Sequence, residues 1–193
     1  SAASDVYKRQ EETRSLRELM ECSHPDWEVL FHLYHDRKMN PMSFLKSEQF
    51  LNILTESCLE KYPYIAFADA FHTMRSMLLP VLYLLGSEVP LADTYHAIST
   101  GYGGLLACLG GYVYRRPVLL TEHGIYTRER EEEIIRAKWV IPSFKKQWIS
   151  FFYMLSEAIY KRAFRVTSLF TNAMLTQIQI GCCLLYTSPS PRD

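Results

Sequence analysis

The chain has 193 residues, with 21 Lys and Arg against 21 Asp and Glu, and 48% of its residues are hydrophobic and 13% aromatic. This composition is typical of a globular protein and excludes a disordered tail, a collagen-like repeat and a polyelectrolyte. With no net charge and no run of more than two Lys or Arg, the chain also lacks the basic surface of a nucleic-acid-binding protein, so no nucleic acid is expected as a partner. Its longest apolar stretch, residues 77–85, contains Pro80 and is far shorter than the ~20 residues that span a bilayer.

Both ends of the chain resemble translated sequencing adapter. Residues 4–10 can be encoded by TCA GAT GTG TAT AAG AGA CAG, and the reverse complement of that DNA, in another frame, encodes Cys-Leu-Leu-Tyr-Thr-Ser, the sequence of residues 183–188. Transposon-based library tagging leaves such an inverted repeat. We therefore interpret residues 1–10 and 182–193 as adapter, exclude them from reasoning about the fold, and expect them to pack against nothing specifically.

Three cysteines remain between these ends: Cys22, Cys58 and Cys108. None belongs to a CxxC pair or has a histidine at metal-ligand spacing. Isolated thiols with mostly apolar neighbours are typical of reduced core residues, so we expect neither a disulfide framework nor a zinc site.

Residues 11–85 are predicted to be helical, because apolar residues recur at helical spacing. Asn40 and Pro41 interrupt the pattern, and Ser43 is a candidate cap for the helix that follows. Residues 71–85 predict a helix that is kinked or begins again at Pro80, and residues 86–90 end it.

The second half of the chain alternates strand-like and helix-like patterns. Predicted strands cover residues 94–98, 117–121 and 165–170, and predicted helices cover 105–114, 128–138, 143–163 and 171–180. This alternation predicts an α/β fold, a parallel sheet with helices on both faces and a helical region before it. Such sheets bind ligands at the carboxyl ends of their strands, where the glycine-rich and histidine-containing turns of this sequence fall.

The turn after the first predicted strand holds Ser99, Thr100, Gly101, Tyr102 and Gly103. Its backbone N–H groups and hydroxyls precede a helix, a place suited to a phosphate or a sugar hydroxyl. The turn lacks the lysine of a P-loop and the spacing of a dinucleotide-binding motif. The alternative is a tight turn whose glycines only permit close packing.

The turn after the second predicted strand holds Glu122, His123, Gly124 and Tyr126. A neutral histidine here can bond a sugar hydroxyl or support charge at a reacting carbon, and Glu122 is a candidate second carboxylate that contacts the substrate. The alternatives are a histidine bonded to local backbone and a glutamate that only caps the turn.

Charged residues open the next predicted helix. Thr127 can cap this helix and its acidic residues complement the helix dipole, which explains most of the run without a ligand. Arg128 and Arg130 fit that explanation less well and are candidates to meet anionic ligand groups. In the following long helix the aromatic stripe from Trp148 onward is predicted to be core, with a membrane-surface helix or the cover of a sugar site as alternatives.

Several of these segments resemble the PelF-type glycosyltransferases of Pel exopolysaccharide synthesis, members of glycosyltransferase family 4. The resemblance is strongest over residues 91–136, which include ADTYHAISTGYGGLL and LTEHGIYTRERE. Further matching positions are Trp148, Phe151, Phe152, Tyr160, Asn172, Gln177, Ile178 and Gly181.

The resemblance implies that residues 11–181 are part of the N-terminal, acceptor-side, Rossmann-like domain of a cytoplasmic GT-B enzyme. Such an enzyme transfers a sugar, with retention, from a nucleotide-sugar donor, here expected to be UDP-linked, to a growing polysaccharide acceptor. It needs no bound metal or other cofactor, and subunits of a membrane export complex are candidate partners. The resemblance also puts His123 against the donor sugar. Most nucleotide contacts in the family come from a carboxyl-terminal domain, so the fragment alone is expected to be inactive.

Two features depart from the family pattern. The opening strand with its glycine-rich loop is missing upstream of Glu11, and residues 169–172 lack the acidic residue that the family places before Asn172. Two other functions therefore stay open: another GT-B enzyme, such as a sugar-nucleotide epimerase or a phosphorylase, and a non-catalytic scaffold subunit of an export complex.

Overall fold

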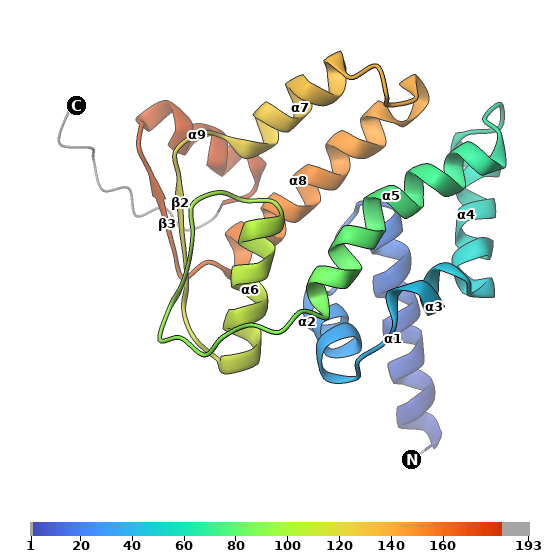
Figure 1. Ribbon diagram of the computed structural model, residues 1–193, viewed down its shortest axis with the longest axis horizontal. Helices are drawn as coiled ribbons and strands as arrows, with labels where there is room; N and C mark the ends of the chain where they lie inside the picture. The colour runs from blue at the N-terminus through green and yellow to red at the C-terminus, as the bar shows by residue number, and fades with distance from the viewer. Residues whose placement is uncertain (1, 183–193) are drawn as a thin grey trace. The chain divides into compact units, whose positions relative to one another are not determined.

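The computed structural model describes residues 2–182, with side chains from residue 6 onward. The chain divides into two compact units, residues 1–88 and 89–193. The first unit is helical, and the second is an α/β unit that contains the parallel sheet (Figure 1).

The elements of the first unit are α1 (Ala2–Met20), α2 (Trp27–Phe31), the π-helix η1 (His32–Asp36), α3 (Pro41–Leu45), α4 (Glu48–Lys61) and α5 (Phe67–Leu85). Polar side chains start three of the helices. Asp26 accepts hydrogen bonds from the N–H groups of Glu28 and Val29, Asn40 from Met42 and Ser47 from Phe50. The predicted cap Ser43 is wrong, because Asn40 begins α3 with Pro41 at its first position and Ser43 lies inside the helix.

Helix α5 runs through Pro80 as one helix, so the predicted restart there is wrong. Proline removes one backbone donor and breaks a helix where the freed carbonyl finds no partner. Pro80 lies on the exposed side of α5, where water can bond that carbonyl, while Met77, Leu78, Val81 and Leu82 are buried on the other side.

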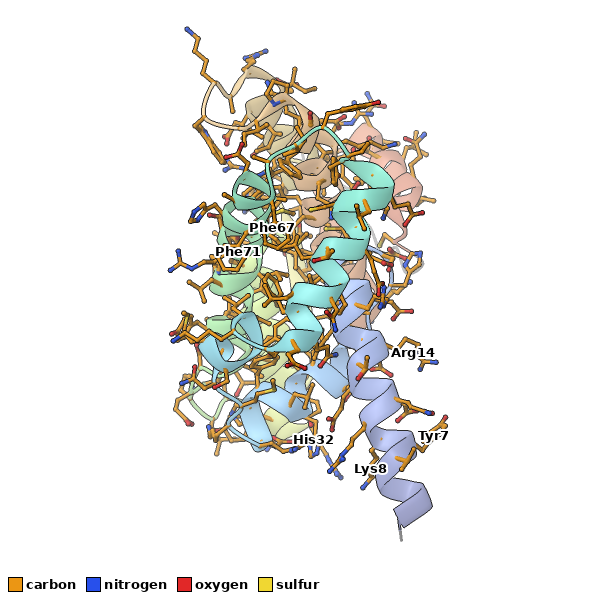
Figure 2. All side chains as sticks on the ribbon, turned by 90° about the vertical axis from the view of Figure 1, so that its right-hand side faces the viewer. Tyr7, Lys8, Arg14, His32, Phe67 and Phe71 are labelled. Carbon is orange, nitrogen blue, oxygen red and sulfur yellow. The ribbon has the colours of Figure 1, made fainter. Side chains whose placement is uncertain are left out.

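Helix α1 includes the first segment that we attribute to adapter. Residues 6–10 are all exposed, and Figure 2 shows Tyr7 and Lys8 projecting from the helix. Burial begins further along α1, where Leu16, Leu19 and Met20 enter the core of the first unit. At the other end Cys182 is only 3% exposed, so the expectation that it packs against nothing is wrong; residues 183–193 lie outside the described chain.

The elements of the second unit are β1 (Tyr95–Ala97), α6 (Tyr102–Tyr114), β2 (Val118–Glu122), α7 (Tyr126–Arg136), the 3-10 turn η2 (Pro142–Phe144), α8 (Lys145–Arg162), β3 (Arg165–Ser168) and α9 (Thr171–Ile180). The strands form one parallel sheet in the order β1-β2-β3, with Ala97 beside Leu120 and Glu122 beside Ser168. The predicted mixed α/β class and the parallel pairing of the three segments are confirmed.

Helices flank this sheet, and their recorded contacts reach one of its faces. On that face, Tyr95 and Val118 meet α6 at Gly110 and Gly111, and Glu122 bonds to α8 and α9. Side chains of the opposite face, such as Leu119 and Thr121, are only half-buried. The recorded contacts of α6, α8 and α9 therefore lie on the face that carries Tyr95, Val118 and Glu122.

Some boundaries differ from the predicted ones. Helix α6 begins at Tyr102 rather than residue 105, so Tyr102 and Gly103 belong to its first turn. Strand β2 continues to Glu122, which was expected in the turn. The four described cysteines, Cys22, Cys58, Cys108 and Cys182, form no disulfide with one another.

Candidate functional site

The two predicted ligand turns lie at the same edge of the sheet and touch each other. They follow β1 and β2, which are parallel neighbours. The hydroxyl of Thr100 in the first turn donates to Oε1 of Glu122, at the end of β2, over 3.4 Å. Gly101 lies against the ring of Tyr126, at the start of α7. The sheet therefore brings together the two turns that the sequence singles out.

Gly101 is required by this contact. Its φ is +80°, a conformation that other residues rarely adopt, and an added Cβ would lie 2.5 Å from the Tyr126 ring. Glycine at this position thus permits both the backbone turn and the approach of α7. The packing explanation holds for Gly101, while Gly103 is exposed in the first turn of α6 and an added Cβ there would meet nothing within 4 Å.

Glu122 joins five parts of the unit through one buried carboxylate. It is 1% exposed and accepts hydrogen bonds from Thr100, from the Tyr160 hydroxyl at 2.5 Å and from Nε2 of Gln177 at 2.7 Å. It also accepts the backbone N–H of Tyr126, which begins α7. Tyr160 lies on α8 and Gln177 on α9, so β2, the β1 turn, α7, α8 and α9 all meet at this side chain.

These four donors use the acceptor sites that a carboxylate offers. Glu122 has no exposed oxygen left for a sugar or a phosphate, so its geometry suits positioning the two turns rather than contacting a ligand. Burial raises the pKa of Glu122 above its ordinary value, and the hydrogen bonds from Tyr160, Gln177, Tyr126 and Thr100 oppose that shift without cancelling it. Burial and the neighbouring Glu122 carboxylate likewise raise the pKa of Tyr160.

The network extends to residues that sequence reasoning missed. Ser156 of α8 donates to the hydroxyl of Thr100 over 2.7 Å. The available signal was Ser156 and Tyr160, two polar side chains four residues apart on a helix face predicted to be apolar. Two buried polar atoms beside Glu122, Oγ of Ser168 and Oε1 of Gln177, have no partner within the described chain.

His123 follows the end of β2 and is exposed at the carboxyl edge of the sheet. Its ring makes no hydrogen bond to the part of the chain that the structure describes, so the alternative of a histidine bonded to local backbone finds no support there. Gly124, also exposed, leaves room for a carboxylate of α7, because an added Cβ would lie 2.5 Å from Oε1 of Glu129.

Aromatic rings and an arginine line the start of α7. The rings of Tyr102 and Tyr126 both meet Phe152 edge-on, at centroid distances of 6.4 and 6.0 Å. The guanidinium of Arg130 lies 5.3 Å from the centroid of the Tyr126 ring and pairs with Glu133. Burial raises the pKa of Tyr102 to about 12, so its hydroxyl stays protonated at neutral pH.

The remaining candidates differ in exposure. Ser99 is half-buried in the β1 turn, and Arg128 is exposed on the first turn of α7. Nε of Arg130 is buried and, within residues 2–182, has no hydrogen-bond partner.

In neither α6 nor α7 does the residue at the N-cap position form a capping hydrogen bond through its side chain. Gly101 precedes α6, and Thr100 is engaged with Glu122 instead. The predicted cap Thr127 is wrong: Ile125 takes the cap position of α7, and Thr127 is buried inside the first turn with an unpartnered hydroxyl among the described residues. Glu122 supplies the capping carboxylate of α7 through the N–H of Tyr126.

No group of three or more His, Cys, Asp or Glu side chains within residues 2–182 is arranged to hold a metal ion. No helix in the same range is long and apolar enough to cross a bilayer.

A family model described as "Domain of unknown function (DUF3492)" matches residues 2–184. The chain belongs to the DUF3492 family. No curated protein and no solved structure matches this DUF3492 chain. The DUF3492 match covers both units, including the turns at Gly101 and His123.

Proposed function

We propose that the full-length protein is a retaining glycosyltransferase that moves a sugar from a nucleotide-sugar, UDP-linked, to a growing exopolysaccharide. The observation that carries this proposal is the joining of two turns at one sheet edge, through Thr100 and Glu122, with His123 exposed beside them. The resemblance of the same two turns to PelF-type enzymes supports it, and the DUF3492 domain is found in glycosyltransferase-like proteins.

In this proposal the bond between the anomeric carbon of the donor and a diphosphate oxygen breaks. A bond from that carbon to an acceptor hydroxyl oxygen forms on the same face of the sugar, and the hydroxyl proton leaves with the nucleoside diphosphate. Positive charge develops at the anomeric carbon as the first bond breaks, so groups that meet the sugar there act on the transition state.

His123 is the proposed catalytic residue. It is exposed and has no described partner, so its ring is free to bond a donor-sugar hydroxyl or to support the developing charge. The proposed binding groups are the turn Ser99, Thr100, Gly101, Tyr102 and Gly103, with Gly124, Tyr126, Arg128 and Arg130 across from it.

The helix starts and the arginines have the right chemistry for an anionic or hydroxylated ligand. Helix α6 begins without a side-chain cap, so its first N–H groups are available to oxygen ligands. The Arg130 side chain is half-buried, with its guanidinium over the Tyr126 ring, and its exposed donors can meet an anionic ligand group. Glu122 enters as a positioning residue that holds both turns. The resemblance further suggests cytoplasmic action without a bound metal, next to subunits of an export complex.

A donor assay on the full-length protein tests this function. We expect release of nucleoside diphosphate from one UDP-sugar in the presence of acceptor, with the anomeric configuration of the donor retained in the polymer by NMR. Transfer with inversion would exclude the retaining reaction. Release of a sugar 1-phosphate by phosphate would indicate a phosphorylase, and epimerised UDP-sugar without transfer would indicate an epimerase. Absence of all three with donors and acceptor present would favour a scaffold.

A further inference from the structure

The loop that joins α7 to α8 exposes a tryptophan. We call residues 134–148 the α7–α8 tip. Trp139 is 70% exposed and Ile135 57%, although tryptophan is among the most buried residue types on average. Figure 1 shows α7 and α8 side by side, with the tip at the end away from the sheet. These exposed side chains therefore lie apart from the candidate site.

The tip is built to hold Trp139 outward. Four of its apolar side chains are buried: Ile134, Val140, Phe144 and Trp148. The exposed ring of Trp139 meets Trp148 edge-on at 5.6 Å, and Nζ of Lys145 donates to the carbonyl of Ile135 over 2.5 Å. Packing thus fixes the loop while leaving one aromatic and one aliphatic side chain in solvent.

All the charged side chains of the α7–α8 tip are basic. Residues 134–148 contain Arg136, Lys138, Lys145 and Lys146 and no Asp or Glu. Lys138 and Lys146 are exposed, and the Arg136 side chain, paired at 3.5 Å with Glu132 one turn back, is 81% exposed. The acidic residues Glu131, Glu132 and Glu133 lie earlier on α7, outside the tip.

We propose that the α7–α8 tip binds the surface of an anionic lipid bilayer. Tryptophan prefers the boundary between headgroups and acyl chains, and lysine and arginine nearby are attracted to anionic headgroups. An acidic protein partner would need carboxylates at fixed positions. Exposed lysines on flexible stems around one apolar anchor suit a diffuse negative surface better.

Vesicle binding by the full-length protein tests this. The probe is vesicles of phosphatidylcholine mixed with phosphatidylglycerol, compared with phosphatidylcholine alone, by cosedimentation. We expect binding to the anionic vesicles only, weakened by salt. The double variant Lys138→Gln/Lys146→Gln should bind roughly 30-fold more weakly, because each lysine near an anionic surface raises the affinity about fivefold. Trp139→Ser should bind about tenfold more weakly because the anchor is lost.

Matched variants serve as controls. Lys46→Gln/Lys61→Gln removes the same charge from exposed positions of the first unit, and Phe164→Ser removes an exposed aromatic residue from the second. Both should bind anionic vesicles as the wild type does. Tryptophan fluorescence should shift to the blue on binding and lose that shift in Trp139→Phe, because Trp27 and Trp148 are already buried.

Three results would overturn the proposal. Equal binding to neutral and anionic vesicles would show that charge does not drive binding. Unchanged binding by the tip variants would show that another part of the protein contacts the vesicle. Trp139 shielded from acrylamide in the absence of vesicles would show that another part of the protein, or a second copy, covers the tip.

Discussion

Replacing His123 with alanine in the full-length protein should lower turnover by roughly 100-fold, about 2.7 kcal/mol, and raise the Michaelis constant for the donor much less. In the proposed mechanism, the contact of His123 with the donor sugar strengthens as charge develops at the anomeric carbon. Because His123 is exposed and bonds to nothing in the described chain, the same change should leave the free energy of unfolding within about 0.5 kcal/mol of the wild type. Donor kinetics and urea unfolding on the same preparation measure both quantities.

His96→Ala is a matched control, since His96 is also exposed and lies on β1, before the turn, where its ring bonds to Thr121 at 2.9 Å. Its turnover should stay near that of the wild type. If His123→Ala kept normal turnover per folded molecule, His123 would not be the catalytic residue. The remaining candidates for contact with the substrate would be Arg128, Arg130 and the turn at Gly101.

Replacing Glu122 with alanine should be the most destabilising single change in the second unit. It removes the acceptor of Thr100, Tyr160, Gln177 and the N–H of Tyr126, all in a buried setting. Buried donors left without partners cost about 1–3 kcal/mol each, so we expect a loss of about 3 kcal/mol or more in the free energy of unfolding. Glu157→Ala is the control: Glu157 lies on α8 and pairs with Lys161 near the surface, where such a pair contributes about 1 kcal/mol or less. Urea midpoints of the two variants should differ accordingly, and equal losses would contradict the role of Glu122.

The variant Glu122→Gln removes the ionisable carboxyl group and keeps the size and shape of the side chain. Because burial raises the pKa of Glu122 in the folded protein, its contribution to stability is present below the ordinary value of 4.5 and is lost as the pH rises through the folded value. The wild type should therefore lose stability relative to Glu122→Gln as the pH rises from 4.5 toward neutrality. Thermal midpoints of both proteins across that range measure the effect. If the wild type instead gained stability relative to Glu122→Gln as the pH rose, the four hydrogen bonds would lower the pKa of Glu122 by more than burial raises it.

The architecture of the second unit could be predicted because each strand combines β-branched or aromatic residues with a following turn. Strands β1, β2 and β3 fall within a residue or two of the predicted segments. Which face the helices cover could not be predicted, since that depends on strand order, and strand order is set by contacts between segments far apart in the sequence.

The sequence predicted that the two turns meet at one edge of the sheet, but it did not predict which side chains join them. The residues of both turns were identified from glycine and histidine positions alone. Glu122 was assigned to a turn because strand ends are hard to locate from sequence, yet its alternation with Val118 and Leu120 places it on the buried face. The predicted caps Ser43 and Thr127 were wrong although both residue types can cap a helix. Asn40 caps α3, and the Glu122 carboxylate accepts the first N–H of α7, that of Tyr126.

We propose that the carboxyl edge of this sheet holds the donor sugar. Hydrogen exchange of the full-length protein, with and without the UDP-sugar, tests this because it reports on each turn separately. We predict that the donor slows exchange in residues 99–103 and 123–130 and leaves Arg115 and Arg116, at the opposite edge of the sheet, unchanged. Protection confined to other segments while transfer proceeds would contradict this proposal.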